Sequence, residues 1–292
     1  MKKLLSNRNQ LILSMLIFGT IGVVRRAIPF SSSVVALARA VIGLVFLLLT
    51  RVLRHEPIDR EAVRRNLPKL LLLGALLAVN WISLFEAFTY TSVAAATMCY
   101  YMAPVIVILL SPPLFGEPLG LRKGLCALAA VAGMVLVSGV LHSGLHGLRG
   151  IALGLIAACF YAAIVILNKT LRDISAGDRT ILQFAVAAAV MLPYVLLTEP
   201  VADLRPTPTV LLMLLVAGVV HTGLSYTMYF GSIARVPAQT AALLSYLDPV
   251  VAVLLSITLL REPMSPDALL GAALVIGAMI ASELEPKKSR AA

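Results

Sequence analysis

Two stretches of this chain repeat one another: YMAPVIVILLSPPLFGEP at residues 101–118 and YLDPVVAVLLSITLLREP at residues 246–263. A tyrosine, a proline and a final Glu-Pro pair recur in register, 145 residues apart. Unrelated apolar segments often share small residues, but they rarely share Tyr-x-x-Pro and Glu-Pro at one spacing. The sequence therefore predicts an internal duplication, with five-helix repeats at residues 1–145 and 146–292.

The composition is that of a chain embedded in lipid. Of 292 residues, 60% are hydrophobic and 13% are charged, whereas soluble domains carry about 25% charged residues. An apolar run of about 20 residues can cross a bilayer, and a run in hydrocarbon must be helical because its backbone groups have no water to bond. Ten such runs are present: Leu11–Val24, Val34–Leu53, Leu70–Phe88, Val93–Phe115, Leu125–Leu141, Ile151–Asn168, Thr180–Leu197, Val210–Phe230, Gln239–Leu260 and Ala268–Ser282. We predict an all-α polytopic membrane protein with ten transmembrane helices, which excludes a soluble enzyme or a disulfide scaffold.

The basic residues predict the orientation of these spans. Of the 24 lysines and arginines, 18 fall in segments on the side of the N-terminus, five fall on the other side, and Arg39 lies within a span. Cytoplasmic loops carry the excess of Lys and Arg in membrane proteins. We therefore expect both termini in the cytoplasm, and we attribute the net charge of +10 to contact with anionic lipid rather than with nucleic acid.

Five spans in each repeat give the two repeats opposite orientations in the membrane. Inverted repeats of this kind are typical of secondary transporters, which expose a midplane site to each side in turn. No ATPase motif is present, so a gradient would supply the energy. A duplicated membrane scaffold without transport is the alternative interpretation.

The chain resembles the EamA-type carriers of the drug/metabolite transporter superfamily along its whole length. The matching residues are Phe18-Gly19, Arg39, Trp81, Pro104, Gly116-Glu117-Pro118, Pro249 and Glu262-Pro263. Phe18 stands where the family commonly has Trp, and Arg261 where it often has Gly. The resemblance implies a bacterial carrier of small metabolites, often an exporter of amino acids or organic cations.

Asp248 is the sharpest candidate for the transport site. A carboxylate inside a span costs several kcal/mol unless it faces protein or water. Ser245 lies on the same helical face, and Pro249 removes a backbone hydrogen bond that would otherwise hold the helix. Asp248 is expected to bind a substrate ammonium or to exchange a proton; capping a loosened carbonyl or pairing with an arginine is the alternative.

Two further polar residues lie inside spans, and both have two interpretations. His221 is in line with Ser225 and Tyr229 and would suit a proton relay or a structural bond to a carbonyl. Arg39 would bind a substrate carboxylate, snorkel to the surface, or serve as the counterion of Asp248 or Glu86.

Aromatic and amide side chains within the spans complete the candidate pathway. Rings far from the interface suit stacking or cation–π contact with a cationic substrate, although helix packing explains any single ring equally well. The candidates in this group are Asn80, Trp81, Tyr100, Tyr101, Tyr226, Tyr229 and Tyr246, with Tyr90 and Tyr161 as further rings.

Competing functions lack the residues that they need. A membrane enzyme would require paired acids, a metal cluster or a nucleophile with its base, and a channel would require continuous polar rings along a pore. We expect no enzyme activity, metal or cofactor. The prediction is a secondary transporter of the inner membrane, monomeric or weakly dimeric, that exports amino acids or related amines by alternating access. Proton coupling, uncoupled facilitation, exchange and a channel-like permease are left open.

Overall fold

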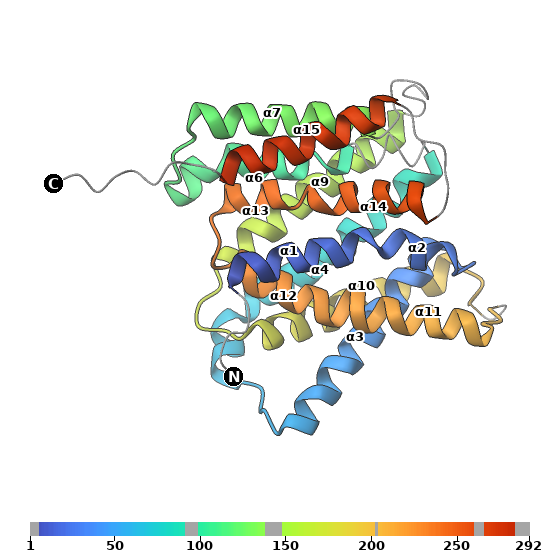
Figure 1. Cartoon of the computed structure of the whole chain (residues 1–292). Helices are drawn as coiled ribbons and strands as arrows, with labels where there is room; N and C mark the ends of the chain where they lie inside the picture. Colours follow the sequence, from blue (N-terminus) through green and yellow to red (C-terminus); the bar gives the residue numbers. More distant parts are fainter. Residues whose placement is uncertain (1–5, 91–98, 138–147, 202–203, 260–265, 284–292) are drawn as a thin grey trace.

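The fold is known from a computed structural model, which describes residues 6–90, 99–137, 148–201, 204–259 and 266–283 (Figure 1). All regular secondary structure in these ranges is helical. The elements are α1 (Asn7–Gly19), α2 (Ile21–Arg26), α3 (Ser32–Arg54), α4 (Arg60–Tyr90), α6 (Ala103–Phe115), α7 (Leu121–Val137), α9 (Leu148–Lys169), α10 (Ala176–Thr198), α11 (Pro208–Gly218), the π-helix η2 (Val219–Leu224), α12 (Ser225–Ile233), α13 (Ala238–Leu244), α14 (Leu247–Thr258) and α15 (Pro266–Glu283).

These elements correspond to the ten predicted spans, so the polytopic all-α fold is confirmed. The ten spans in chain order are α1 with α2, α3, α4, α6, α7, α9, α10, α11 with η2 and α12, α13 with α14, and α15. Among the described residues, five helices are each long and apolar enough to cross a membrane alone: Ser32–Arg54, Arg60–Ala87, Leu148–Lys169, Ala176–Thr198 and Pro208–Ile233.

The outer surface of the bundle requires lipid. Large apolar side chains point outward along many helices, among them Leu49, Leu128 and Leu196, which are 57%, 67% and 60% exposed. A soluble protein rarely exposes contiguous apolar surface on this scale. The chain is therefore a multi-pass membrane protein.

The third span begins earlier than the hydropathy pattern predicts. We expected it at Leu70, but α4 begins at Arg60 and runs through Pro68. The side chain of Asp59 accepts bonds from the backbone N–H groups of Glu61 and Ala62 at 3.1 and 2.9 Å. This N-cap starts the helix in a polar stretch that hydropathy alone does not mark.

Several spans are broken near their middle. The ninth span divides at Ser245–Tyr246, between α13 and α14. Proline lacks an N–H and clashes with the carbonyl four residues earlier, which for Pro249 is that of Ser245. Two other irregularities were not predicted: α1 ends at Gly19 and α2 begins after Thr20, and the eighth span contains the π-helical segment η2.

The helix contacts follow a two-fold pattern. By span order, α1 of the first half corresponds to α9 of the second, α4 to α12, and α6 to α14. When corresponding helices are exchanged, the α4–α9 contact becomes the α1–α12 contact, and the α6–α9 contact becomes the α1–α14 contact. The α3–α10, α6–α13 and α7–α15 pairs map onto themselves. This is the arrangement expected when two similar halves pack around one axis.

Two glycines allow close contacts between helix backbones. A Cβ on Gly19 of α1 would lie 2.6 Å from the carbonyl oxygen of Asp248, and one on Gly133 of α7 would lie 2.6 Å from that of Gly271. Such distances are too short for any larger residue. Gly19 therefore brings α1 directly against the first turn of α14, where Asp248 lies.

One end of the bundle carries basic residues at several helix termini. α1 begins and α15 ends at the left of Figure 1, where α7 also begins and α9 ends. We call this the basic end, because Arg122 and Lys169 lie at these termini of α7 and α9, and Arg51 lies in the last turn of α3.

Candidate functional site

A small cavity lies between the two halves of the bundle. Its volume is about 140 Å³, below the roughly 300–1,000 Å³ of sites for drug-sized ligands. The lining residues come from both halves: Met15, Phe18, Ile21, Arg39, Tyr100, Tyr101, Tyr161, Tyr226, Tyr229, Ser245 and Asp248. The cavity therefore suits a small solute and combines one cation, one anion and several aromatic rings.

Arg39 reaches the cavity from α3 and is held in place from two sides. Its Nε donates to the hydroxyl of Thr222 at 3.0 Å, and its guanidinium lies 5.7 Å from the ring centroid of Trp81. The Thr222 hydroxyl donates in turn to the carbonyl of Ala217 at 2.7 Å, within the π-helical region. Because Nε alone is used by Thr222, the two terminal amino groups keep the fork geometry that suits a carboxylate.

Asp248 enters the cavity from the first turn of α14. Its carboxylate accepts a hydrogen bond from the hydroxyl of Tyr101 and feels the positive charge of Arg39 across the cavity. In the part of the chain that the structure describes, no salt bridge joins these two side chains. Neither charge neutralises the other by direct contact, although Arg39 was one of the predicted counterions.

Tyrosine rings form most of the remaining wall. Tyr161 stacks on Tyr100 with centroids 5.5 Å apart and on Tyr229 with centroids 6.4 Å apart. Tyr226 lies 4.8 Å from Phe18. These rings present π faces and hydroxyl groups close to Asp248, an arrangement that suits a cationic group.

The tyrosines also close the cavity toward the basic end. The hydroxyls of Tyr161 and Tyr229 are 2.5 Å apart. The small cavity beyond them has a volume of about 10 Å³, and Ala241 and Ala242 are buried there. The Tyr161–Tyr229 pair is therefore the floor of the cavity.

At the basic end itself, Glu117 joins the two halves. Its carboxylate accepts bonds from the backbone N–H groups of Ala238 and Gln239 at 2.8 and 3.3 Å, and Lys169 lies 4.0 Å away. Glu117 thus caps the start of α13 from the end of α6. We call this contact the Glu117 cap.

A second pair of contacts joins α3 to α10. Arg51 forms a salt bridge with Asp178 at 2.7 Å at the basic end, and Ser33 donates to Glu199 at the opposite end. The two helices are therefore fastened at both of their ends.

Four predicted site residues lie outside the cavity lining. His221 bonds to the hydroxyl of Thr20 at 2.7 Å and approaches the carbonyl of Val216 at 3.3 Å, contacts that fit a structural role at the break between α1 and α2. The other three support the wall from behind. Asn80 donates to the carbonyl of Ala157 at 2.7 Å, Trp81 packs on Tyr226 at 6.1 Å, and the Tyr246 hydroxyl donates to the carbonyl of Tyr101 at 3.3 Å.

Some lining residues were not among the site residues predicted from the sequence. Met15 and Ile21 carry no polar signal, and Phe18 was noted only for its resemblance to the family motif. Tyr161 was named as a ring without a place in the site. Its position opposite Phe18 in the repeat was the available signal. Within the described ranges, no group of three His, Cys, Asp or Glu side chains is arranged to hold a metal ion.

Comparison with known proteins gives consistent matches. The sequence profile of the EamA-like transporter family matches residues 10–139 and again residues 148–282. A protein of Bacillus subtilis (strain 168) named uncharacterized transporter YxxF is 28% identical over 247 residues, which cover 84% of this chain and 79% of that protein. A solved crystal structure superposes with a TM-score of 0.84 at 18% identity, covering 95% of this chain and 97% of the other; at that identity it shows the fold alone.

Proposed function

The chain belongs to the EamA-like transporter family, and on this premise we propose that it exports a small amino-acid-like metabolite, or a related amine, by alternating access. It is a membrane transporter, and the proposal concerns its substrate, its direction and its mechanism. The observation that carries the proposal is the joint presence of Arg39 and Asp248 in one cavity of about 140 Å³.

The two charges match the two ends of an α-amino acid. The terminal amino groups of Arg39 suit a substrate carboxylate, while Asp248 and the surrounding tyrosines suit an ammonium group. Burying either charge alone is costly, but a zwitterion that pairs with both compensates each of them. A primary amine would use the Asp248 side of the site only.

The contacts between the halves support alternating access. Arg39 belongs to the first half and Asp248 to the second, so a bound substrate bridges the two bodies whose relative motion opens the site. The Tyr161–Tyr229 floor and the Glu117 cap close the basic end. Following the positive-inside bias, we assign the basic end and both termini to the cytoplasmic side of a bacterial inner membrane. The described state is then closed toward the cytoplasm.

Asp248 is also the group through which a proton gradient would act. The Asp248 carboxylate can hold an ammonium group or a proton, but not both at once. The substrate and the proton therefore compete for it, and this competition couples their movements across the membrane. We therefore propose substrate–proton exchange at Asp248.

The test uses the purified full-length protein in two steps. A thermal-shift screen against amino acids and amines identifies ligands, because a ligand that binds the folded state raises its apparent stability. The best ligand is then loaded into proteoliposomes, and efflux is measured with and without an opposing proton gradient. We expect saturable efflux, counter-exchange with external ligand, and acceleration by protons outside.

Two variants make the assay specific. Asp248→Asn removes the charge with little change in size and is expected to abolish proton-dependent efflux. Glu61→Gln, in an exposed i,i+4 pair with Arg65, is the matched control at a site where the pair contributes little and is expected to behave like the wild type. Normal efflux by Asp248→Asn would contradict the proposed role of this residue, and non-saturable flux without counter-exchange would contradict the carrier mechanism.

A further inference from the structure

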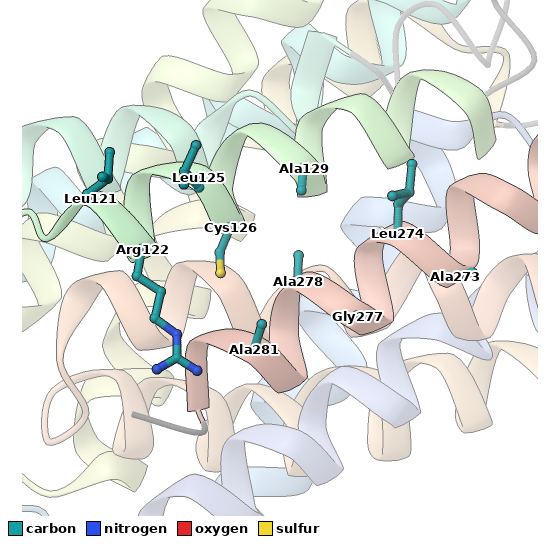
Figure 2. Close-up of a pocket in the computed structure, with 10 residues that line it drawn as sticks. All are labelled: Leu121, Arg122, Leu125, Cys126, Ala129, Ala273, Leu274, Gly277, Ala278 and Ala281. Carbon is teal, nitrogen blue, oxygen red and sulfur yellow. The ribbon is translucent and has the colours of Figure 1, made fainter. Parts of the chain in front are cut away.

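A long groove lies on the lipid-facing side of the bundle, between α7 and α15. Figure 2 shows its two walls, and its volume is about 670 Å³. Each helix contributes five residues at the same spacing, from Leu121 to Ala129 on α7 and from Ala273 to Ala281 on α15. All of them are apolar or small except Arg122.

The two helices pack against each other, and the groove lies between them on the side of the basic end. At Gly133 the backbones are in contact, since a Cβ there would meet the carbonyl of Gly271. Toward the basic end the facing residues of α15 are small except Leu274, and a Cβ added to Gly277 would meet nothing within 4 Å. The groove is open toward the lipid-facing surface, so a hydrocarbon chain of the surrounding lipid can fill it.

The dimensions fit the lipid of one leaflet. The α7 wall runs from Leu121 to Ala129, a distance of about 12 Å along the helix at 1.5 Å per residue step. One leaflet of hydrocarbon is roughly 15 Å thick, half of the ~30 Å core. The groove therefore runs along most of the leaflet at the basic end.

Arg122 gives the groove a positive end. Its side chain is exposed, and in Figure 2 it extends from α7 toward the last turns of α15, near Ala281. Among the described residues no carboxylate forms a salt bridge with Arg122. An apolar slot that ends in a cation at the membrane surface is complementary to an acyl chain that ends in a phosphate.

We propose that this groove binds one anionic phospholipid, with an acyl chain between α7 and α15 and the headgroup phosphate paired with Arg122. A second copy of the chain fits the site less well. A two-fold dimer through this face would set groove against groove and bring the two Arg122 side chains to the same interface, where like charges repel.

Native mass spectrometry of the full-length protein tests the proposal directly. The protein is reconstituted with equal amounts of phosphatidylglycerol and phosphatidylcholine and is released gently, so that tightly held lipids remain attached. We expect one retained phosphatidylglycerol, preferred over phosphatidylcholine about fivefold, the preference that one basic residue near the membrane surface provides. Equal retention of the two lipids would overturn the proposal.

Three variants separate the parts of the site. Gly277→Leu fills the groove and is expected to lose the retained lipid, while Gly124→Leu is the matched control, because a Cβ at Gly124 also meets nothing within 4 Å and Gly124 does not line the groove. Arg122→Gln is expected to keep a lipid without preference for phosphatidylglycerol.

A lipid signal that Gly277→Leu leaves unchanged would overturn the proposal. The proposal would also be overturned if the wild type were a dimer and Gly277→Leu dissociated it, because the occupant of the groove would then be a second copy of the chain. If Gly277→Leu does not fold, as judged by thermal unfolding, Ala273→Leu blocks the same groove from another position on α15.

Discussion

Replacing Arg39 by Lys should weaken the binding of an amino acid far more than the binding of the corresponding amine. Lysine keeps the positive charge but presents a single ammonium in place of the planar fork. In the structure, Nε of Arg39 is used by Thr222 at 3.0 Å, so a substrate carboxylate would bond to the two terminal amino groups. The variant removes one of these two bonds.

The expected loss of affinity for the amino acid follows from the loss of one hydrogen bond. A hydrogen bond between charged groups contributes about 1.5–3 kcal/mol, which corresponds to a roughly 10- to 150-fold change in the dissociation constant. The substitution also removes the Thr222 bond and alters the contact with Trp81, 5.7 Å away. Those losses affect every ligand equally, because they do not involve the ligand.

The assay therefore compares two ligands on two proteins. Dissociation constants are measured by titration calorimetry for the best amino acid and for the amine that lacks its carboxylate, with the wild type and with Arg39→Lys. For each protein, the dissociation constant of the amino acid is divided by that of the amine. Comparing this ratio between Arg39→Lys and the wild type isolates the carboxylate contact, as in a double-mutant cycle. An equal weakening of both ligands would refute the reasoning, because Arg39 would then act on the fold of the site rather than on the substrate carboxylate.

Three other substitutions test neighbouring contacts. Gly19→Ala places a Cβ 2.6 Å from the carbonyl of Asp248 and should lower stability by about 1–3 kcal/mol in thermal unfolding, whereas Gly277→Ala, which meets nothing within 4 Å, should not. Glu117→Ala leaves two N–H donors of α13 without their cap and should lower stability by about 0.5–2 kcal/mol, with faster labelling of cysteines introduced below the cavity floor; an unchanged labelling rate would argue against a closure role. Tyr161→Phe removes a hydroxyl contact of 2.5 Å that contributes about 0.5–1.5 kcal/mol, and should raise substrate leak in proteoliposomes while ligand affinity changes less than threefold.

Much of the fold was predictable because the bilayer imposes it. Apolar runs of fixed length must be helices in hydrocarbon, and the repeated Tyr-x-x-Pro and Glu-Pro pairs mark matching positions in two halves. The break at Ser245–Tyr246 was also predictable, since Pro249 cannot sustain a regular helix. The break at Thr20 and the π-helix η2 were not, because local sequence there gives no proline or charge to mark them.

The lining of the cavity was predictable in its polar members and less so in its shape. Asp248 and Arg39 stand out because charges inside a span are costly, and both line the cavity. His221 stands out for the same reason but lies behind the wall, bonded to Thr20. Periodicity tells which face of a helix is polar, but it does not tell how far that face lies from the cavity. Met15 and Ile21 show the converse, since apolar lining residues resemble any other packing residue.

The origin of the two cavity charges follows from their places in the repeats. Counted from the serine N-caps of α3 and α10, Ser31 and Ser175, Arg39 has the neutral counterpart Gln183. Counted from the repeated tyrosines, Asp248 has the counterpart Ala103. An assembly of two identical, unfused subunits would carry each charge twice across its axis, as two arginines facing two aspartates. Under the predicted duplication, fusion into one polypeptide lets each half diverge by itself, and it leaves a single dipole at the centre that would distinguish the head of a ligand from its tail.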